Sequence, residues 1–325
     1  MSSVYRPLLR RAWSITWQEK HLWVFGLFTA VIVSGGELNM LVRNLNRLQS
    51  LGTWADTVRA EGFSFVPRSL AALAGWPAGW YAALAALIAL VLFLLWFAVV
   101  AEGALVGGIE RARRRADMSL AEGIAHGKKL WGKVAVITAG FHLGAHLAWA
   151  LFALPPFLLF LAFGSSLWFT AFLIVAFLCL IPAGLAIALL FRLSLAAVVV
   201  EQQTLRAAWG CAWELFRAHW LVLLETVILL TAGTTLAAIV ALAAAAVGLA
   251  LIFGPLLLLS FVTGAPAVLS IVVGLALVLF LFALLWVGAV LATFQQAVWV
   301  LLFVRMRESP PLAKLVRFFA LRARR

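Results

Sequence analysis

The sequence predicts an all-α protein, a polytopic bundle of about six transmembrane helices with amphipathic helices at the membrane surface. Three observations predict this fold class. Hydrophobic residues make up 66% of the 325-residue chain, charged residues make up only 11%, and the mean hydropathy is +1.10. An average soluble domain contains about 25% charged residues, and a soluble core of this size cannot bury so many apolar side chains. The composition therefore excludes a soluble globular enzyme and a disordered chain.

Six segments are candidates to cross the hydrocarbon core, which takes about 20 mostly apolar residues of helix. The first is short, whereas the fifth and sixth exceed one upright span and must tilt or continue as interfacial helix. If both long segments divide, the chain crosses eight times. We expect helix breaks at Pro155–Pro156 and Gly254–Pro255, because proline interrupts the backbone hydrogen bonds of a helix. The six segments are about 22–34, 79–100, 134–154, 167–190, 220–252 and 267 to just before 305.

The distribution of Lys and Arg predicts the orientation of these spans. Only four of the 25 basic residues, Arg43, Arg47, Arg59 and Arg68, fall in segments that are predicted to lie outside. Because cytoplasmic segments are enriched in Lys and Arg, both termini are predicted to lie on the cytoplasmic side of a bacterial inner membrane. Topology thus explains the net charge of +13, and nucleic acid is not an expected partner.

Two arginine-rich runs adjoin the predicted inner ends of spans, and Glu102 is expected to face the first of them. Basic side chains at such positions attract anionic lipid headgroups by about 1 kcal/mol each. We therefore expect the lipid bilayer, and its anionic phospholipid headgroups in particular, to be a partner. The expected contacts are Arg111, Arg113, Arg114, Arg115, Arg322, Arg324 and Arg325.

One pattern occurs three times on the predicted inner side, namely an amphipathic helix followed by two membrane spans. It is clearest from Leu205 onward, where apolar residues lie at i, i+3, i+4 and i+7 and share one helix face. Ser119 and Glu122 form a capping box at the start of the second such helix. In the alternative interpretation, basic interfacial helices that contain Trp simply recur before spans. The predicted units within the single membrane domain, residues 1–325, are 1–101, 117–190 and 202–304.

Two further segments flank these spans. Residues 35–78 are predicted to form a small helical cap on the outer side, since capping signals there precede short amphipathic stretches. Residues 305–325 are predicted to form a basic cytoplasmic tail.

Polar residues inside the apolar segments are the candidate functional residues, because ionisable groups within a span are costly. His142 and His146 are one helical turn apart, and such a pair can hold a metal ion when a third ligand is near. Glu225 is the best carboxylate candidate, although we expect it to lie nearer the inner side than His146. Gln295 and Gln296 could join helices, and all five residues could line a polar pathway.

No catalytic or cofactor-binding pattern accompanies these residues. The sequence contains no phosphate-binding glycine loop, no HExxH or CxxC spacing and no Ser-His-Asp order. We therefore expect no cofactor and predict that the protein is not an enzyme. The alternative is a metal-dependent intramembrane enzyme that uses His142 and His146.

The third inner region has a distinctive order of residues. It reads RLSLAAVVVE from Arg192 to Glu201, LRAAW from Leu205 and WELFR from Trp213. This order resembles bacterial polytopic membrane proteins related to the membrane domain of glycerophosphoryl diester phosphodiesterases, in which an Arg and a Glu flank small residues before an Ala-rich helix. The resemblance implies an integral membrane fold of about six helices. It implies no reaction, because the phosphodiesterase catalytic domain has no counterpart in this chain.

Together these features predict a non-enzymatic, multi-pass membrane protein that organises partner proteins or lipids, as a subunit of a larger membrane complex or as a homo-oligomer. The alternative is a small-molecule or lipid transporter with a polar pathway between the hairpins. In that case His142, His146, Glu225 and Gln295 are expected to converge on a cavity.

Overall fold

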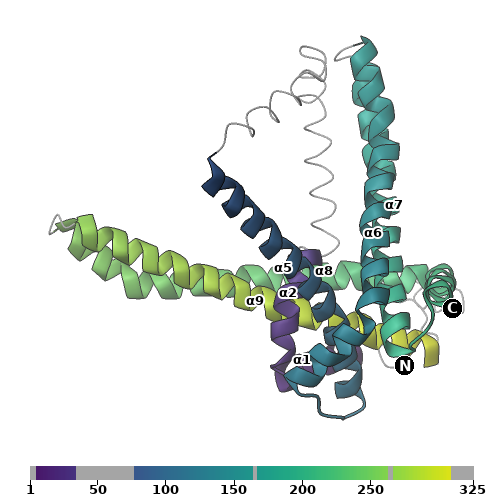
Figure 1. Cartoon of the computed structure of the whole chain (residues 1–325), viewed down its shortest axis with the longest axis horizontal. Helices are drawn as coiled ribbons and strands as arrows, with labels where there is room; N and C mark the ends of the chain where they lie inside the picture. Colours follow the sequence, from purple (N-terminus) through teal and green to yellow (C-terminus); the bar gives the residue numbers. More distant parts are fainter. Residues whose placement is uncertain (1–4, 34–76, 164–166, 263–265, 309–325) are drawn as a thin grey trace, which may run out of the picture.

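Helices account for all regular secondary structure in the residues that the computed structural model describes, which are 5–33, 77–163, 167–262 and 266–308. The prediction of an all-α fold is confirmed. Nearly all of the predicted cap, residues 35–78, and most of the predicted tail, residues 305–325, lie outside the described residues. The helices are α1 (Tyr5–Gln18), α2 (Leu22–Val33), α5 (Ala78–Arg113), α6 (Leu120–Phe163), α7 (Leu167–Val200), α8 (Leu205–Val262) and α9 (Pro266–Glu308) (Figure 1).

Five of these helices, α5 to α9, are long and apolar enough to cross a membrane. They contain the second to sixth predicted spans. The first predicted span coincides with α2, which has only 12 residues in the described part of the chain. At 1.5 Å per residue such a helix is about 18 Å long, which is less than the hydrocarbon thickness of about 30 Å. The chain is thus a multi-pass membrane protein with five candidate spans among its described helices.

The long helices continue through the positions where the sequence predicts breaks. Pro155 and Pro156 lie inside α6 and Pro255 lies inside α8, so the predicted breaks are wrong. A proline removes one backbone hydrogen bond, but ending a helix within lipid would leave several backbone groups without partners. Neither the fifth predicted span, within α8, nor the sixth, within α9, divides, so the described residues do not support eight crossings.

The three predicted amphipathic segments adopt two arrangements. The first is the separate helix α1, whereas the second and third are the first turns of α6 and α8. The predicted capping box begins α6: the Glu122 N–H donates to Ser119 Oγ at 3.3 Å, and the Ser119 N–H donates to Glu122 Oε2 at 3.2 Å. A kink at His219 (φ −132°, ψ 23°) interrupts α8. The amphipathic segment is therefore continuous with the following span in α6 and bent away from it in α8.

The six helices α2 and α5 to α9 form a closed ring of neighbours. Each packs against the next in the chain, and α9 packs back against α2. The helix that contains the second span of each predicted unit, α5, α7 or α9, is here called a return helix, and the three return helices also contact one another. Three successive hairpins joined in a circle would make these contacts. The division into repeat units stays a prediction.

The buried core lies at the C-terminal ends of the return helices. Many buried apolar side chains belong to residues 98–109, 188–199 and 289–306, and they pack with α1 and with the starts of α2, α6 and α8. Away from this core the hairpins diverge, since α6 and α7 point in one direction and α8 and α9 in another (Figure 1). The most apolar stretches of the spans are only 6% to 28% buried. Most of their surface is therefore available to lipid.

Glycines allow the helices to approach closely at the core. A Cβ on Gly127 of α6 would lie 2.2 Å from the Val100 carbonyl oxygen of α5, and a Cβ on Gly26 of α2 would lie 2.5 Å from the Ala289 carbonyl oxygen of α9. Real Cβ atoms do not approach an oxygen so closely. Because lipid tails are as apolar as the helices, close packing of this kind carries much of the association between them.

Substituting Gly127 with Ala is therefore expected to destabilise the fold by about 1–3 kcal/mol, the usual cost of overpacking a tight contact. Gly132 is the matched control on the same helix, since a Cβ there meets nothing within 4 Å and Ala is favoured over Gly in a helix by about 1 kcal/mol. Thermal unfolding in detergent should show a lower midpoint for Gly127→Ala and an unchanged or higher one for Gly132→Ala. Equal shifts would contradict the α5–α6 contact.

Candidate functional site

The two candidate histidines lie on one face of α6. The Nδ1–H of His146 donates to the His142 carbonyl oxygen at 2.6 Å, and the His146 side chain is exposed. Within the described residues, no group of three or more His, Cys, Asp or Glu side chains could hold a metal ion. In this part of the chain the pair therefore lacks the third ligand that a metal site needs.

Glu225 is connected to the start of the chain. The Tyr5 hydroxyl of α1 donates a hydrogen bond to Glu225 Oε2 of α8, across 220 positions of sequence. Tyr5 is only 7% exposed, so its hydroxyl meets the carboxylate in a mostly buried setting. This bond fixes the first amphipathic helix against the third hairpin.

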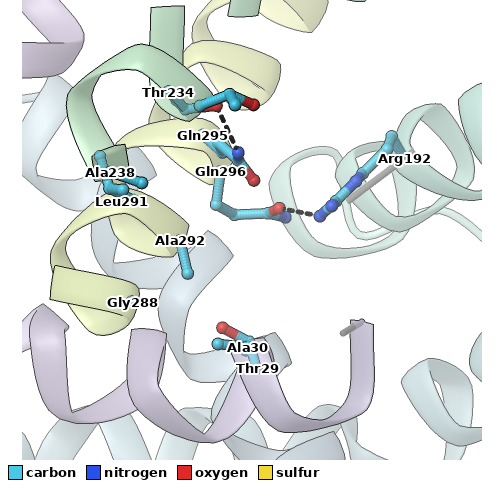
Figure 2. A pocket seen from close by; sticks show the side chains of 11 residues that line it. Thr29, Ala30, Arg192, Thr234, Ala238, Gly288, Leu291, Ala292, Gln295 and Gln296 are labelled. Carbon is cyan, nitrogen blue, oxygen red and sulfur yellow. Dashed lines mark hydrogen bonds between the residues drawn. The ribbon is translucent and has the colours of Figure 1, made fainter. Parts of the chain in front are cut away.

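Gln295 and Gln296 connect α9 to two other helices (Figure 2). Gln295 Nε2 donates to Thr234 Oγ1 of α8 at 3.0 Å, and Gln296 Oε1 accepts from Arg192 Nη1 of α7 at 2.5 Å. Hydrogen bonding between helices is one of the two roles that the sequence predicts for these amides.

The same side chains line a cavity of about 220 Å³ between α2, α7, α8 and α9, here called the polar pocket. Of the four residues that the transport alternative requires to converge, Gln295 lines this pocket, and the other three are not part of its described lining. The structure therefore does not bring those four side chains together there. The polar residues of the lining are Thr29, Arg192, Thr234, Thr235, Gln295 and Gln296.

A buried polar cluster joins the three return helices. Glu102 of α5, Arg192 of α7 and Gln296 of α9 are 1%, 8% and 4% exposed. Glu102 Oε2 accepts a hydrogen bond from Thr138 Oγ1 at 3.5 Å, and Arg192 attracts the same carboxylate electrostatically. Glu102 is thus enclosed by helices and does not face the solvated arginine run, contrary to the expectation from the sequence.

Sequence reasoning expected Glu102 in a solvated setting and did not identify Arg192 as a candidate. Each lies two residues beyond the predicted inner end of a span, at residues 100 and 190, where a charged residue is ordinary. The missed signal is their shared register with Gln296. Aligning the ends of the return helices places the three polar residues together, each followed eight or nine positions later by a charged residue. Those charged residues are Glu110, Glu201 and Arg305.

An apolar cavity of about 560 Å³ adjoins the polar pocket and is here called the apolar groove. It lies between α7 and α8, and its lining is aliphatic apart from Thr231 and Thr235. Thr235 lines both cavities. The polar pocket and the apolar groove are therefore neighbours on either side of this residue.

Ion pairs hold three of the four arginines of the first basic run. Arg113 donates to both Glu110 oxygens at 2.7 and 2.9 Å, and Arg114 Nε donates to Glu110 Oε1 at 2.6 Å. Arg111 Nη1 lies 3.6 Å from Glu122 Oε2. Glu110 is only 7% exposed, so Arg113 and Arg114 are paired with a buried carboxylate, whereas the Arg111–Glu122 pair is exposed and therefore weak. Contact between these arginines and lipid headgroups stays a prediction. Arg322, Arg324 and Arg325 lie outside the described residues.

Comparison with known proteins adds no assignment to this geometry. No protein-family model, no curated protein and no solved structure matches the chain. The resemblance to the membrane domain of glycerophosphoryl diester phosphodiesterases therefore stays an expectation, and the function has to be argued from the two cavities.

Replacing Arg192 with Met is expected to destabilise the fold by about 3–5 kcal/mol, because it leaves the buried Glu102 carboxylate and the Gln296 amide without their cationic neighbour. Arg206→Met is the matched control, since Arg206 is exposed on α8. The midpoint of thermal unfolding in detergent measures both effects. Similar midpoints for the two variants would show that the cluster does not hold the return helices together.

Proposed function

We propose that this protein binds lipid molecules between its hairpins and organises lipids, together with protein partners, in the membrane without catalysing a reaction. The observation that carries the proposal is the apolar groove, which shares the lining residue Thr235 with the polar pocket. An apolar cavity beside a polar one suits an amphiphile, because the acyl chain and the headgroup have these two characters.

The lining of the apolar groove favours a lipid over a water-soluble compound. Ile228, Leu236 and Ile239 are 59%, 64% and 60% exposed, so the groove opens toward the surface that faces lipid. The polar side chains of the described lining are those of Thr231 and Thr235. The hydroxyl group of a threonine in a helix commonly bonds to the carbonyl one turn earlier, so these two residues offer a bound solute few hydrogen bonds. A polar solute would lose its hydration in the groove and gain few hydrogen bonds in return.

Transport of a small molecule or a lipid is the second candidate function. It is supported by the polar pocket, since polar groups at the depth of the spans are costly and are often functional. The pocket contains only Gln295 of the four residues expected to converge, as far as the described lining extends. Binding is therefore the better-supported of the two functions.

We also propose that the protein lies in a bacterial inner membrane with both termini in the cytoplasm. The proposal is supported by the concentration of basic residues near the buried core, for example Arg113, Arg206 and Arg305 at or near the core ends of their helices. Because positive charge is enriched on the cytoplasmic side, this end of the molecule is the inner one.

Filling the apolar groove is expected to reduce the bound lipid. In Ile228→Trp the indole occupies part of the groove, and excluding two methylene groups at about 0.8 kcal/mol each corresponds to about tenfold weaker binding. Leu251→Trp is the matched control, because Leu251 is 73% exposed on the same helix and does not line the groove. Mass spectrometry of lipid retained in mild detergent measures both, and equal retention would overturn the proposal.

Cysteine labelling tests the orientation. In a cysteine-free background, Glu214→Cys on the amphipathic part of α8 should react with an impermeant maleimide only from the cytoplasmic side. Leu167→Cys, at the end of α7 that is farthest from the buried core, should react only from outside. Both native side chains are exposed, so the reagent has access to each. The reverse pattern would refute the proposed orientation.

A further inference from the structure

The polar pocket determines which lipid the apolar groove can take, and the inference from it rests on the proposed function. We infer that the site binds an anionic phospholipid, with its headgroup in the polar pocket beside Arg192 and an acyl chain along the apolar groove (Figure 2).

The charge of the pocket favours an anion. Arg192 is the only charged residue in the described lining, and a guanidinium group stays protonated and offers five N–H donors. One of these donors goes to Gln296 Oε1. Glu102, whose carboxylate Arg192 attracts, does not line the pocket, so an anion that enters meets the guanidinium without meeting that carboxylate.

The hydrogen-bonding groups of the pocket also suit a phosphate. Phosphate oxygens accept hydrogen bonds, and guanidinium groups bind them with short, charge-assisted ones. The amide groups of Gln295 and Gln296 add N–H donors to the same lining. The donors come from α7 and α9, so a phosphate would be held between two of the return helices.

A zwitterionic headgroup fits this pocket less well. The described lining contains no Asp or Glu, so the ammonium group of such a headgroup would find no carboxylate there. A charge that leaves water without a partner carries a large desolvation cost. The absence of a carboxylate from the described lining therefore disfavours a zwitterionic headgroup, and the presence of Arg192 favours an anionic one.

The groove lies within reach of an acyl chain whose headgroup is at Arg192. On α7, the lining residues Leu185 and Ile181 precede Arg192 by seven and eleven positions, which is about 10 and 16 Å along a helix. Arg192 lies two residues beyond the inner end of the predicted span 167–190, and the other side of the pocket is lined by Thr234 and Thr235 within the predicted span 220–252. All the described lining residues of the groove fall within the predicted spans 167–190 and 220–252, so an acyl chain in the groove would lie at the depth of the hydrocarbon core.

The test measures lipid selectivity on the full-length protein. Native mass spectrometry with equal amounts of phosphatidylglycerol and phosphatidylcholine, which carry the same acyl chains, should show a preference of about tenfold for the anionic lipid, equivalent to about 1.4 kcal/mol. Arg192→Gln should remove this preference. Gln295→Glu should also remove it, because this nearly isosteric change places a carboxylate in the pocket. Gln18→Glu, at an exposed position on α1, is the control and should leave the preference unchanged.

The outcomes separate this inference from the proposed function. If Ile228→Trp weakens the binding of both lipids while Gln295→Glu leaves the preference intact, the anionic headgroup assignment is overturned and the lipid site stands. If Ile228→Trp changes the binding of neither lipid, both assignments fall. Should Arg192→Gln fail to fold, Gln295→Glu decides the question, because it retains the native arginine. Inorganic phosphate provides the last comparison. If it displaces phosphatidylglycerol equally from the native protein and from Ile228→Trp, the site binds free phosphate and the inference is also overturned.

Discussion

Close packing of the return helices at their C-terminal ends is the constraint on which the rest of the structure depends. The hydrophobic effect does not drive helices together within lipid, so their association depends on close packing and on polar contacts. In this chain both occur at one end of the molecule, where Gly127 meets the Val100 carbonyl and Gly26 meets the Ala289 carbonyl. The hairpins are held at this end and diverge beyond it (Figure 1). The polar pocket and the apolar groove both lie between helices of different hairpins.

The buried polar cluster has two consequences for this arrangement. Burying a charged side chain is costly unless its partners are well placed, so Glu102, Arg192 and Gln296 favour one way of bringing α5, α7 and α9 together. Two of these residues, Arg192 and Gln296, also line the polar pocket. The contact that fixes the helices therefore sets the chemistry of the cavity as well, and a change in one affects the other.

Hydropathy and local signals predicted the helices well and the boundaries less well. Five long apolar helices lie where spans were expected, and the capping box of Ser119 and Glu122 forms as predicted. The predicted breaks at Pro155–Pro156 and Gly254–Pro255 were wrong, because a helix in lipid continues through a proline when ending would expose more backbone. For the site, Gln295 and Gln296 were identified from their place inside an apolar segment. Arg192 was not, because a charge just beyond a span is unremarkable in sequence.

The sequence by itself determined that the chain is an all-α membrane protein, where its apolar helices run and which polar residues are unusual within them. These properties depend on residues that are close together along the chain. Only the tertiary structure decided that Thr29, Arg192, Thr235 and Gln295 line one pocket. They come from four helices far apart in sequence, and their meeting depends on how side-chain shapes, glycine contacts and buried hydrogen bonds set the helix crossings. Periodicity along a single helix carries no information about those crossings.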